Sequence, residues 1–285
     1  MRNITTEAFA GVAADEWTDP RPLAEILRQW STVNPEFLFL PRKFKIALSS
    51  AVEDRAAVQM HDIGLYLYRH PDARRVAPAG PGRRRPGTHA DARPGDPRRP
   101  AWQHLLSYVE AILRVYNRYG RRDNKYKARI KILVKALGIE AFAREVEEEW
   151  QHLRDGPAQL TAEECQRVAE RFVLPRPAAG RRRAGLRQRP CGRSGLRPLG
   201  LAQRPGAQVP GYASVVLSTK PGASAPPGDT SPRGADGTCR RDRAGRYGFG
   251  EIRVAHEQNL VLPDVRLENL HALWREACAS RPRHA

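Results

Sequence analysis

The chain has 285 residues, enough for about two domains, and 49 Lys and Arg against 31 Asp and Glu give it a formal charge of +18. No stretch approaches the roughly 20 apolar residues of a membrane helix. The first residues lack the apolar core of a signal peptide, which argues against secretion. Four cysteines without a CxxC spacing exclude a disulfide scaffold and disfavour a zinc ribbon. They are Cys165, Cys191, Cys239 and Cys278.

Most of the positive charge lies in three segments rich in Arg, Pro, Gly and Ala. Segments 71–100, 175–210 and 222–245 carry +5, +9 and +1, so the rest of the chain is close to neutral. Without apolar periodicity they cannot bury enough surface to offset their ordering entropy, and we expect them to be disordered. RNA-binding tails usually carry interleaved aromatic residues, which the first two segments lack. We therefore favour out-of-frame translation of a GC-rich gene over an RNA-binding origin.

The first predicted element is a helix over 15–30, with Asp19 as a plausible N-cap. Its apolar residues recur at helical spacing. A strand is expected over 43–49, with alternate residues on opposite faces. Residues 56–68 are expected to form a second strand pair, or one long strand broken at Gly64.

Three helices are expected after the first Arg-rich segment. Apolar stripes at helical spacing mark them over 105–116, 130–137 and 142–150. Gly138 ends the second of these helices, and Thr161 with Glu164 forms a capping box for a fourth.

Strands are expected beyond the second Arg-rich segment, over 212–218, 251–255 and 260–262. A closing helix follows over 267–274. The mixture of strands and helices does not follow a regular βαβα order, so the predicted fold class is α+β.

The sharpest local feature is the run Pro41-Arg42-Lys43-Phe44-Lys45. Period-two geometry places Lys43 and Lys45 on one strand face, about 7 Å apart at the backbone. Two ammonium groups at this separation suit a small oxyanion or a carboxylated cofactor between them. A solvated edge strand protected by lysines explains the same pattern.

A second basic run extends from Arg121 to Lys131. On a helical wheel, Lys125 and Arg129 lie on one flank of the apolar stripe, with Lys127 and Lys131 on the other. Such groups can reach carboxylates bound at the helix edge, or can simply extend their charged ends from a core helix into water.

Two polar groupings complete the candidates. His256 to Asn259 lie at a strand junction, where amides can bond a polar ligand or cap a turn. His61 and Asp62 are adjacent on a predicted strand and point to opposite faces, so a direct His–Asp pair is not expected. The sequence contains no Walker loop, GxGxxG or nucleophile elbow.

Several stretches closely resemble the siroheme-dependent nitrite/sulfite reductases, in particular the hemoprotein of assimilatory sulfite reductase and its ferredoxin-linked relatives. The resemblance covers about 1–70, 101–173, 208–221 and 246–278. The stretches that carry it are the start of the chain, FLFLPRKFKIALSS, DRAAVQMHDIGL, LLSYVEAILRVYNRYGRRDNKYKARIKILVKALGIEAF, VPGYASVVLSTKP and YGFGEIRVAHEQNLVLPDV.

The resemblance implies siroheme coupled to a 4Fe-4S cluster, and six-electron reduction of sulfite to sulfide or of nitrite to ammonia. Ferredoxin or a flavoprotein reductase would supply the electrons. Lys43, Lys45 and Arg2 would hold the oxyanion and help to deliver protons. The residues implied at the cofactor are Arg42, Lys125, Arg129 and Lys131, which would pair with siroheme carboxylates, and Gln258 and Asn259 in a polar loop.

The chain also departs from the family pattern. Segment 71–100 takes the place of a glycine-rich loop, and 222–245 takes the place of a helix. The chain is expected to begin inside the first siroheme domain and to end before the cysteine motifs that bind the cluster. It is therefore predicted to be a truncated and frameshifted family member, without cluster ligands and inactive.

The predicted organisation has three parts. Residues 1–173 form a first siroheme-binding domain interrupted at 71–100, 174–207 form a low-complexity segment, and 208–285 form a partial second ferredoxin-like half interrupted at 222–245. The expected location is the cytoplasm. The alternative is a basic nucleic-acid-binding protein, which the position of the charge disfavours because a binder needs a structured basic face.

Overall fold

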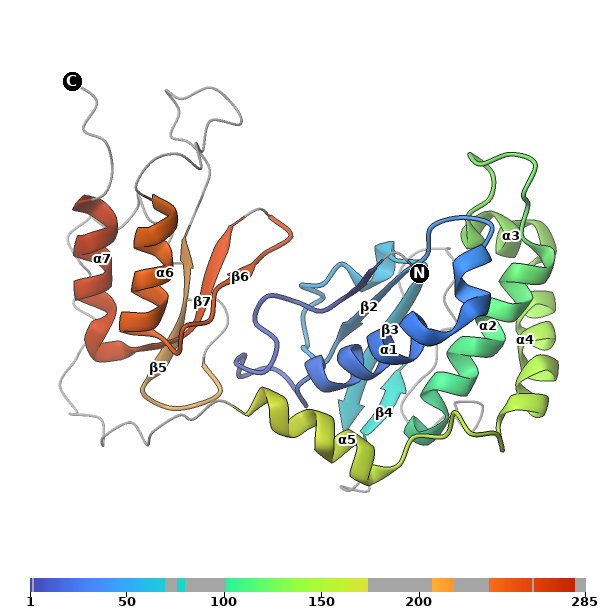
Figure 1. Cartoon of the computed structure of the whole chain (residues 1–285), viewed down its shortest axis with the longest axis horizontal. Coiled ribbons are helices and arrows are strands. Elements are labelled where there is room, and N and C mark those ends of the chain that lie inside the picture. The colour runs from blue at the N-terminus through green and yellow to red at the C-terminus, as the bar shows by residue number, and fades with distance from the viewer. Residues whose placement is uncertain are drawn as a thin grey trace. The chain divides into compact units, whose positions relative to one another are not determined.

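The computed structural model describes residues 1, 3–69, 76–79, 101–173, 207–217, 236–257 and 259–279 (Figure 1). The chain divides into two compact units. The first contains Met1–Thr6 and Trp17–Val173, and the second contains Glu7–Glu16 and Leu174–Ala285. Each unit is described by itself. No helix in the described ranges is long and apolar enough to cross a membrane.

The first unit is built on a four-stranded sheet in the order β1-β2-β3-β4. The first three strands are parallel, and β4 is antiparallel to β3. The register sets Asn3 opposite Lys45 and Ile46 opposite Ile63. The three parallel strands therefore begin at the same end of the sheet. The strands are β1 (Asn3–Thr5), β2 (Lys45–Ser49), β3 (Ile63–Arg69) and β4 (Val76–Ala79).

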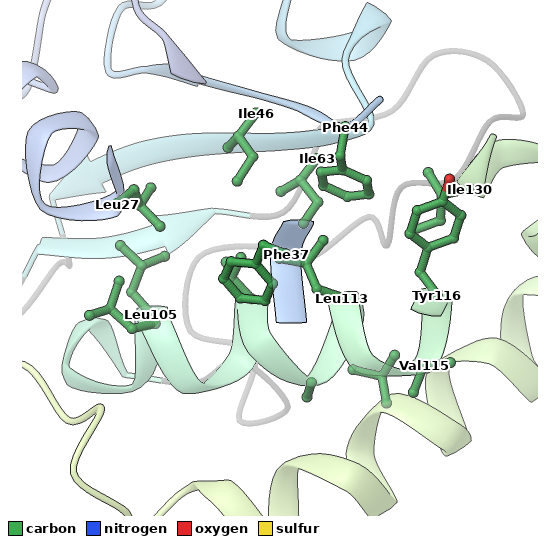
Figure 2. Packing of buried hydrophobic residues seen from close by; sticks show 14 of the residues in the cluster. Leu27, Phe37, Phe44, Ile46, Ile63, Leu105, Leu113, Val115, Tyr116 and Ile130 are labelled. Carbon is green, nitrogen blue, oxygen red and sulfur yellow. The ribbon is translucent and has the colours of Figure 1, made fainter. Parts of the chain in front are cut away.

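One face of this sheet carries the main hydrophobic core. Figure 2 shows Phe44, Ile46 and Ile63 on the side that faces α2, where they meet Leu113 and Tyr116. Burial of this apolar face drives the packing, at roughly 25 cal/mol for each Å² removed from water. The helices are α1 (Arg21–Val33), α2 (Leu105–Tyr119), α3 (Ile130–Leu137), α4 (Ile139–Leu153) and α5 (Ala162–Ala169). The short 3₁₀ turns are η1 (Pro35–Phe39), η2 (Val58–Met60), η3 (Trp102–His104) and η4 (Glu170–Phe172).

The opposite face of the sheet is covered by η2 and the residues around it. Ala47 on β2 and Val58 on η2 are both fully buried there. A Cβ atom added at Gly64 would lie 2.5 Å from Val58 Cγ1 and 2.8 Å from its carbonyl oxygen. This close approach explains the glycine in β3, which the sequence had suggested only as a break.

We expect Gly64→Ala to lower the free energy of unfolding by about 1–3 kcal/mol, because the added methyl group overpacks a buried backbone contact. Urea denaturation followed by circular dichroism measures the loss. Gly245→Ala is the control, since a Cβ there meets no atom within 4 Å and alanine favours a helix. A Gly64→Ala chain as stable as the parent would contradict the expected clash.

The second unit contains a three-stranded antiparallel sheet in the order β5-β7-β6. Its core includes Val215, Leu262, Val265, Ala244 and Leu273, all nearly inaccessible to solvent. The elements are β5 (Tyr212–Leu217), α6 (Asp236–Tyr247), β6 (Arg253–Val254), β7 (Leu260–Arg266), η6 (Leu267–Asn269) and α7 (Leu270–Ala279).

Most predicted elements occur with shifted ends. The first helix begins at Arg21 rather than at residue 15, because Pro20 occupies the N-cap and a proline stands in the first turn. Asp19 still receives the Arg21 backbone N–H, at 2.9 Å. The segment expected as a long strand over 56–68 is a 3₁₀ turn followed by β3. The N-cap half of the capping box predicted at α5 is confirmed, since Glu164 N donates to Thr161 Oγ1 at 3.2 Å. The Glu164 carboxylate accepts from Arg167.

The prediction of disorder was wrong for part of each Arg-rich segment. At the end of 175–210, Ala207 forms an antiparallel bridge with Ala13, and Gln208 N donates to the Val12 carbonyl at 2.8 Å. β4 lies within 71–100, where its backbone pairs with β3.

Most of α6 (Asp236–Tyr247) lies within 222–245, so a helix is present where the sequence was expected to have lost one. The composition of this segment did not predict α6, because the helix is held by contacts with distant residues. Ala244 is fully buried, and Arg243 Nη2 donates to the Glu276 carbonyl at 3.1 Å. The remaining residues of 71–100 and 222–245, and all of 175–206, lie outside the described residues.

Candidate functional site

The fold brings the two basic runs of the sequence together in the first unit. Arg122 Nη1 donates to the Phe39 carbonyl at 2.9 Å. A Cβ on Gly120 would lie 2.6 Å from Pro41 Cγ, so glycine permits a close approach of the two segments. The rings of Phe44 and Tyr116 pack with centroids 5.5 Å apart. Segment 39–45 and the residues that follow α2 therefore form one region.

A buried carboxylate joins these segments at the beginning of β2. Asp62 Oδ1 accepts from Arg129 Nη2 at 2.6 Å and from Nε at 3.1 Å, and the Asp62 side chain is 2% exposed. Its Oδ2 accepts from the Lys45 backbone N–H at 3.0 Å, and its own N–H donates to the Lys45 carbonyl at 3.1 Å. One side chain thus fixes both the end of the basic loop and the first residue of a strand.

Tyr116 supports the same region from α2. Its ring is fully buried, and Oη donates to the Ala128 carbonyl at 2.7 Å. Burial raises the pKa of Tyr116 to about 12, and the nearby Asp62 charge acts in the same direction. The neutral phenol is therefore favoured in the folded chain.

The raised pKa predicts a stability change at high pH. Because the folded pKa lies above the ordinary value near 10, the stabilisation is fully present below about pH 10 and is lost as the pH rises toward 12. Urea midpoints measured from pH 8 to 12 should fall more steeply for the parent than for Tyr116→Phe. Equal slopes for the two chains would contradict this role of the phenol.

The joined region, which consists of segment 39–45 and residues 120–131, has more cationic side chains than carboxylates to pair with them. Among the described residues, no ion pair is found for Arg42, Lys45, Lys127 or Lys131. Lys43 is exposed and Lys45 is half-buried. Lys125 is exposed, with Nζ 5.3 Å from the centroid of the Tyr126 ring. The four side chains without an ion pair suit an oxyanion or a ligand with several carboxylates.

The helical reading of the second basic run was wrong. α3 begins at Ile130, and 121–129 form a loop, so Lys125 and Lys127 do not flank a helical stripe. Only Ala128 in this loop is buried, and a helix needs an apolar face to pack. Arg129, expected at a siroheme carboxylate, contacts Asp62.

The first basic run also differs from its prediction. Ladder pairing begins at Lys45, so Lys43 lies just before the strand rather than within it. The alternation itself persists, because Phe44, Ile46 and Leu48 are all fully buried in the main core. This burial leaves Lys43 and Lys45 on either side of a residue anchored in the core.

The remaining predicted site residues are Arg2, Gln258 and Asn259. Arg2 and Gln258 are outside the described residues. Asn259 belongs to the second unit and is buried, and its carbonyl accepts the Ala255 N–H at 2.8 Å. This backbone bond helps to close the turn between β6 and β7. Its Oδ1 has no hydrogen-bond partner in the described part of the chain.

The structure also supports the expectation that His61 and Asp62 do not pair. His61 Nδ1 lies 2.9 Å from the Ala57 carbonyl, and Nε2 lies 3.4 Å from Thr5 Oγ1. The role of Asp62 was missed, because its cationic partner is 67 positions away. The one signal in the sequence that could have indicated this role is a single acid directly before an apolar strand.

The described residues fit the two implied cofactors to different degrees. The unpaired cations match the carboxylates that decorate siroheme, so they can hold that group. Within the described ranges, no group of three or more His, Cys, Asp or Glu is arranged to hold a metal ion. Cys165 is half-buried, and burial raises the pKa of its thiol, which favours a structural role. We therefore assign no cluster ligand in this part of the chain.

Two family models match the sequence. The model described as "Nitrite and sulphite reductase 4Fe-4S domain" matches residues 1–153. The model described as "Nitrite/Sulfite reductase ferredoxin-like half domain" matches residues 223–280.

Individual relatives agree with these models. "Sulfite reductase (ferredoxin) 1" of Mycolicibacterium paratuberculosis is 34% identical over 169 residues, covering 55% of this chain and 28% of the relative. The chloroplastic "Ferredoxin--nitrite reductase" of Oryza sativa subsp. japonica is 27% identical over 299 residues, covering 97% of this chain and 41% of the relative. The chain therefore spans less than half the length of these relatives.

A solved structure shows the same fold. The Mycobacterium tuberculosis NirA protein superposes with a TM-score of 0.59 at 22% identity. The match covers 98% of this chain and 44% of that chain. At this identity the likeness concerns the fold alone, and it agrees with the predicted α+β class.

Proposed function

The chain belongs to the nitrite and sulphite reductase family, and we propose that it is a siroheme-binding portion of an enzyme that reduces sulfite or nitrite. The observation that carries the proposal is the joining of segment 39–45 to loop 121–129 around Asp62. Arg42 and Lys45 on the first and Lys127 on the second have no ion pair among the described residues. Family membership gives these cations a ligand of matching chemistry. The comparisons give no support to the nucleic-acid-binding alternative.

We assign the oxyanion to Lys43 and Lys45. An ammonium group attracts the negative charge that develops on substrate oxygens and can donate a proton as each oxygen leaves. When bound, siroheme would supply an iron as the site of reduction. The contribution of this chain is to bind and orient the anion and to hold protons at the two Nζ atoms. Arg2 is proposed as a third cation on the basis of the sequence resemblance.

Arg42, Lys125 and Lys131 are proposed partners of siroheme carboxylates. Their support is their position on the joined region and, for Arg42 and Lys131, the lack of an ion pair among the described residues. Arg129 reaches the same region, but its guanidinium contacts Asp62. Gln258 and Asn259 remain proposals from the sequence resemblance.

The proposed electron donor is ferredoxin, which the names of the relatives specify, with a flavoprotein reductase as the alternative. The proposed location is the cytoplasm. None of the four cysteines has a spacing that suits a cluster. We therefore propose that the chain alone binds siroheme and does not sustain turnover.

A siroheme titration of the purified full chain tests the proposal. We expect a saturable absorbance change at one siroheme per chain, with the colour retained through gel filtration. Colourless protein after filtration would contradict siroheme binding. A filter-binding salt titration with RNA is the companion assay, in which tight and salt-steep binding would favour the nucleic-acid alternative.

A further inference from the structure

Asp62 is a buried carboxylate that contacts both basic segments at once. Its Oδ1 receives two donors from Arg129, the last residue before α3, and its Oδ2 receives the backbone N–H of Lys45, the first residue of β2. Asp123, which lies within loop 121–129 itself, pairs with Arg121 at 2.5 Å, and its side chain is 62% exposed. Asp62 is therefore placed to fix the positions of Arg129 and Lys45, whereas Asp123 lies at the surface.

The net stability of a buried ion pair is small, because desolvation offsets most of the attraction between its charges. A stabilising role alone is thus a weak explanation for this pair. Fixing the loop before a ligand binds is a stronger explanation. Loop 121–129 has no regular backbone ladder, so its cations would lose conformational freedom on binding a ligand unless the loop is already fixed.

The contacts with Asp62 provide this fixation at the carboxyl end of the loop. The Arg122 bond to the Phe39 carbonyl provides it at the other end, where Gly120 also meets Pro41. Both tethers lead to segment 39–45, which carries Lys43 and Lys45. The cations of the two segments are consequently held near one another before any ligand binds.

We propose that Asp62 is a positioning residue of the anion site, acting through Arg129 and the Lys45 N–H without touching the ligand. The proposal rests on the proposed function. It gives Arg129 the role of an anchor for the loop, in place of the direct carboxylate contact that the sequence resemblance implied.

A double-mutant cycle on ligand affinity tests this proposal in the full chain. The probe is uroporphyrin, a porphyrin with carboxylates on every pyrrole, and its binding is followed by fluorescence. We expect Asp62→Asn to weaken binding about tenfold, which is within the coupling expected of contacting residues. The chain with both Asp62→Asn and Arg129→Gln should bind no more weakly than the weaker single variant, because the two residues act as one unit.

Asp123→Asn is the matched control, an Asp→Asn change on loop 121–129, and its affinity should stay within about twofold of the parent. Circular dichroism melts establish that each variant is folded. If Asp62→Asn does not melt cooperatively, Arg129→Lys carries the test, because it keeps the cation and loses the two-pronged contact, and we expect at least threefold weaker binding.

The outcomes separate the two proposals. Parent-like affinity of Asp62→Asn or of Arg129→Lys, or losses that multiply in the double variant, would overturn the positioning role and leave the proposed function standing. A parent chain that binds neither uroporphyrin nor siroheme would overturn the proposed function, and the positioning role with it.

Discussion

Replacement of Phe44 by alanine should lower the free energy of unfolding by about 3–5 kcal/mol, the usual cost of removing a buried aromatic side chain. Phe44 is fully buried, belongs to the main core, and packs on the ring of Tyr116 at 5.5 Å (Figure 2). Its loss leaves a cavity between the beginning of β2 and the end of α2. Urea denaturation followed by circular dichroism measures the difference.

Phe39→Ala is the control for this substitution. Phe39 is 72% exposed and lies in the preceding 3₁₀ turn, so its replacement should change stability by no more than about 0.5 kcal/mol. A loss of less than 1 kcal/mol for Phe44→Ala would show that segment 39–45 is not anchored in the core as the structure describes.

Lys43→Ala and Lys45→Ala should each impair oxyanion handling with siroheme binding retained. By analogy with the loss of one preorganised donor at an oxyanion, the expected decrease is about 10²-fold in turnover. A full-length enzyme with all cofactors is needed for that rate. In this chain, the corresponding measurement is sulfite affinity of the siroheme-loaded protein, followed by its absorbance shift.

Lys135→Ala provides the matched control, because Lys135 is an exposed lysine in the last turn of α3. Its sulfite affinity should equal that of the parent. If both Lys43→Ala and Lys45→Ala retain parent affinity and rate, the assigned roles are wrong. If either variant loses siroheme, the lysine contributes to cofactor binding instead.

Local patterns in the sequence determined much of the first unit. The alternation through Phe44, Ile46 and Leu48 predicted the strand and its buried face, because side chains of a strand alternate between its two sides. Helical spacing located α1 to α4 in the same way, and the capping residue Thr161 located the beginning of α5. Such signals are local, since each depends on residues within a turn or two of chain.

Local composition was a poorer guide where distant residues supply the partner. The helix α6 has little apolar character of its own, and it packs through Ala244 and through contacts with Glu276. Strand β1, three residues long, was not predicted, since its existence depends on pairing with β2. Loop 121–129 was taken for a helix because its basic residues happen to fit a helical wheel.

The sequence by itself determined which residues carry positive charge and which are apolar, and its resemblance to nitrite/sulfite reductases indicated their ligand. Only the tertiary structure decided that the two basic runs meet and that Asp62 lies between Lys45 and Arg129. The physical reason is separation along the chain. A bond between residues 67 positions apart requires the fold to bring them together, and no local pattern in the sequence indicates it.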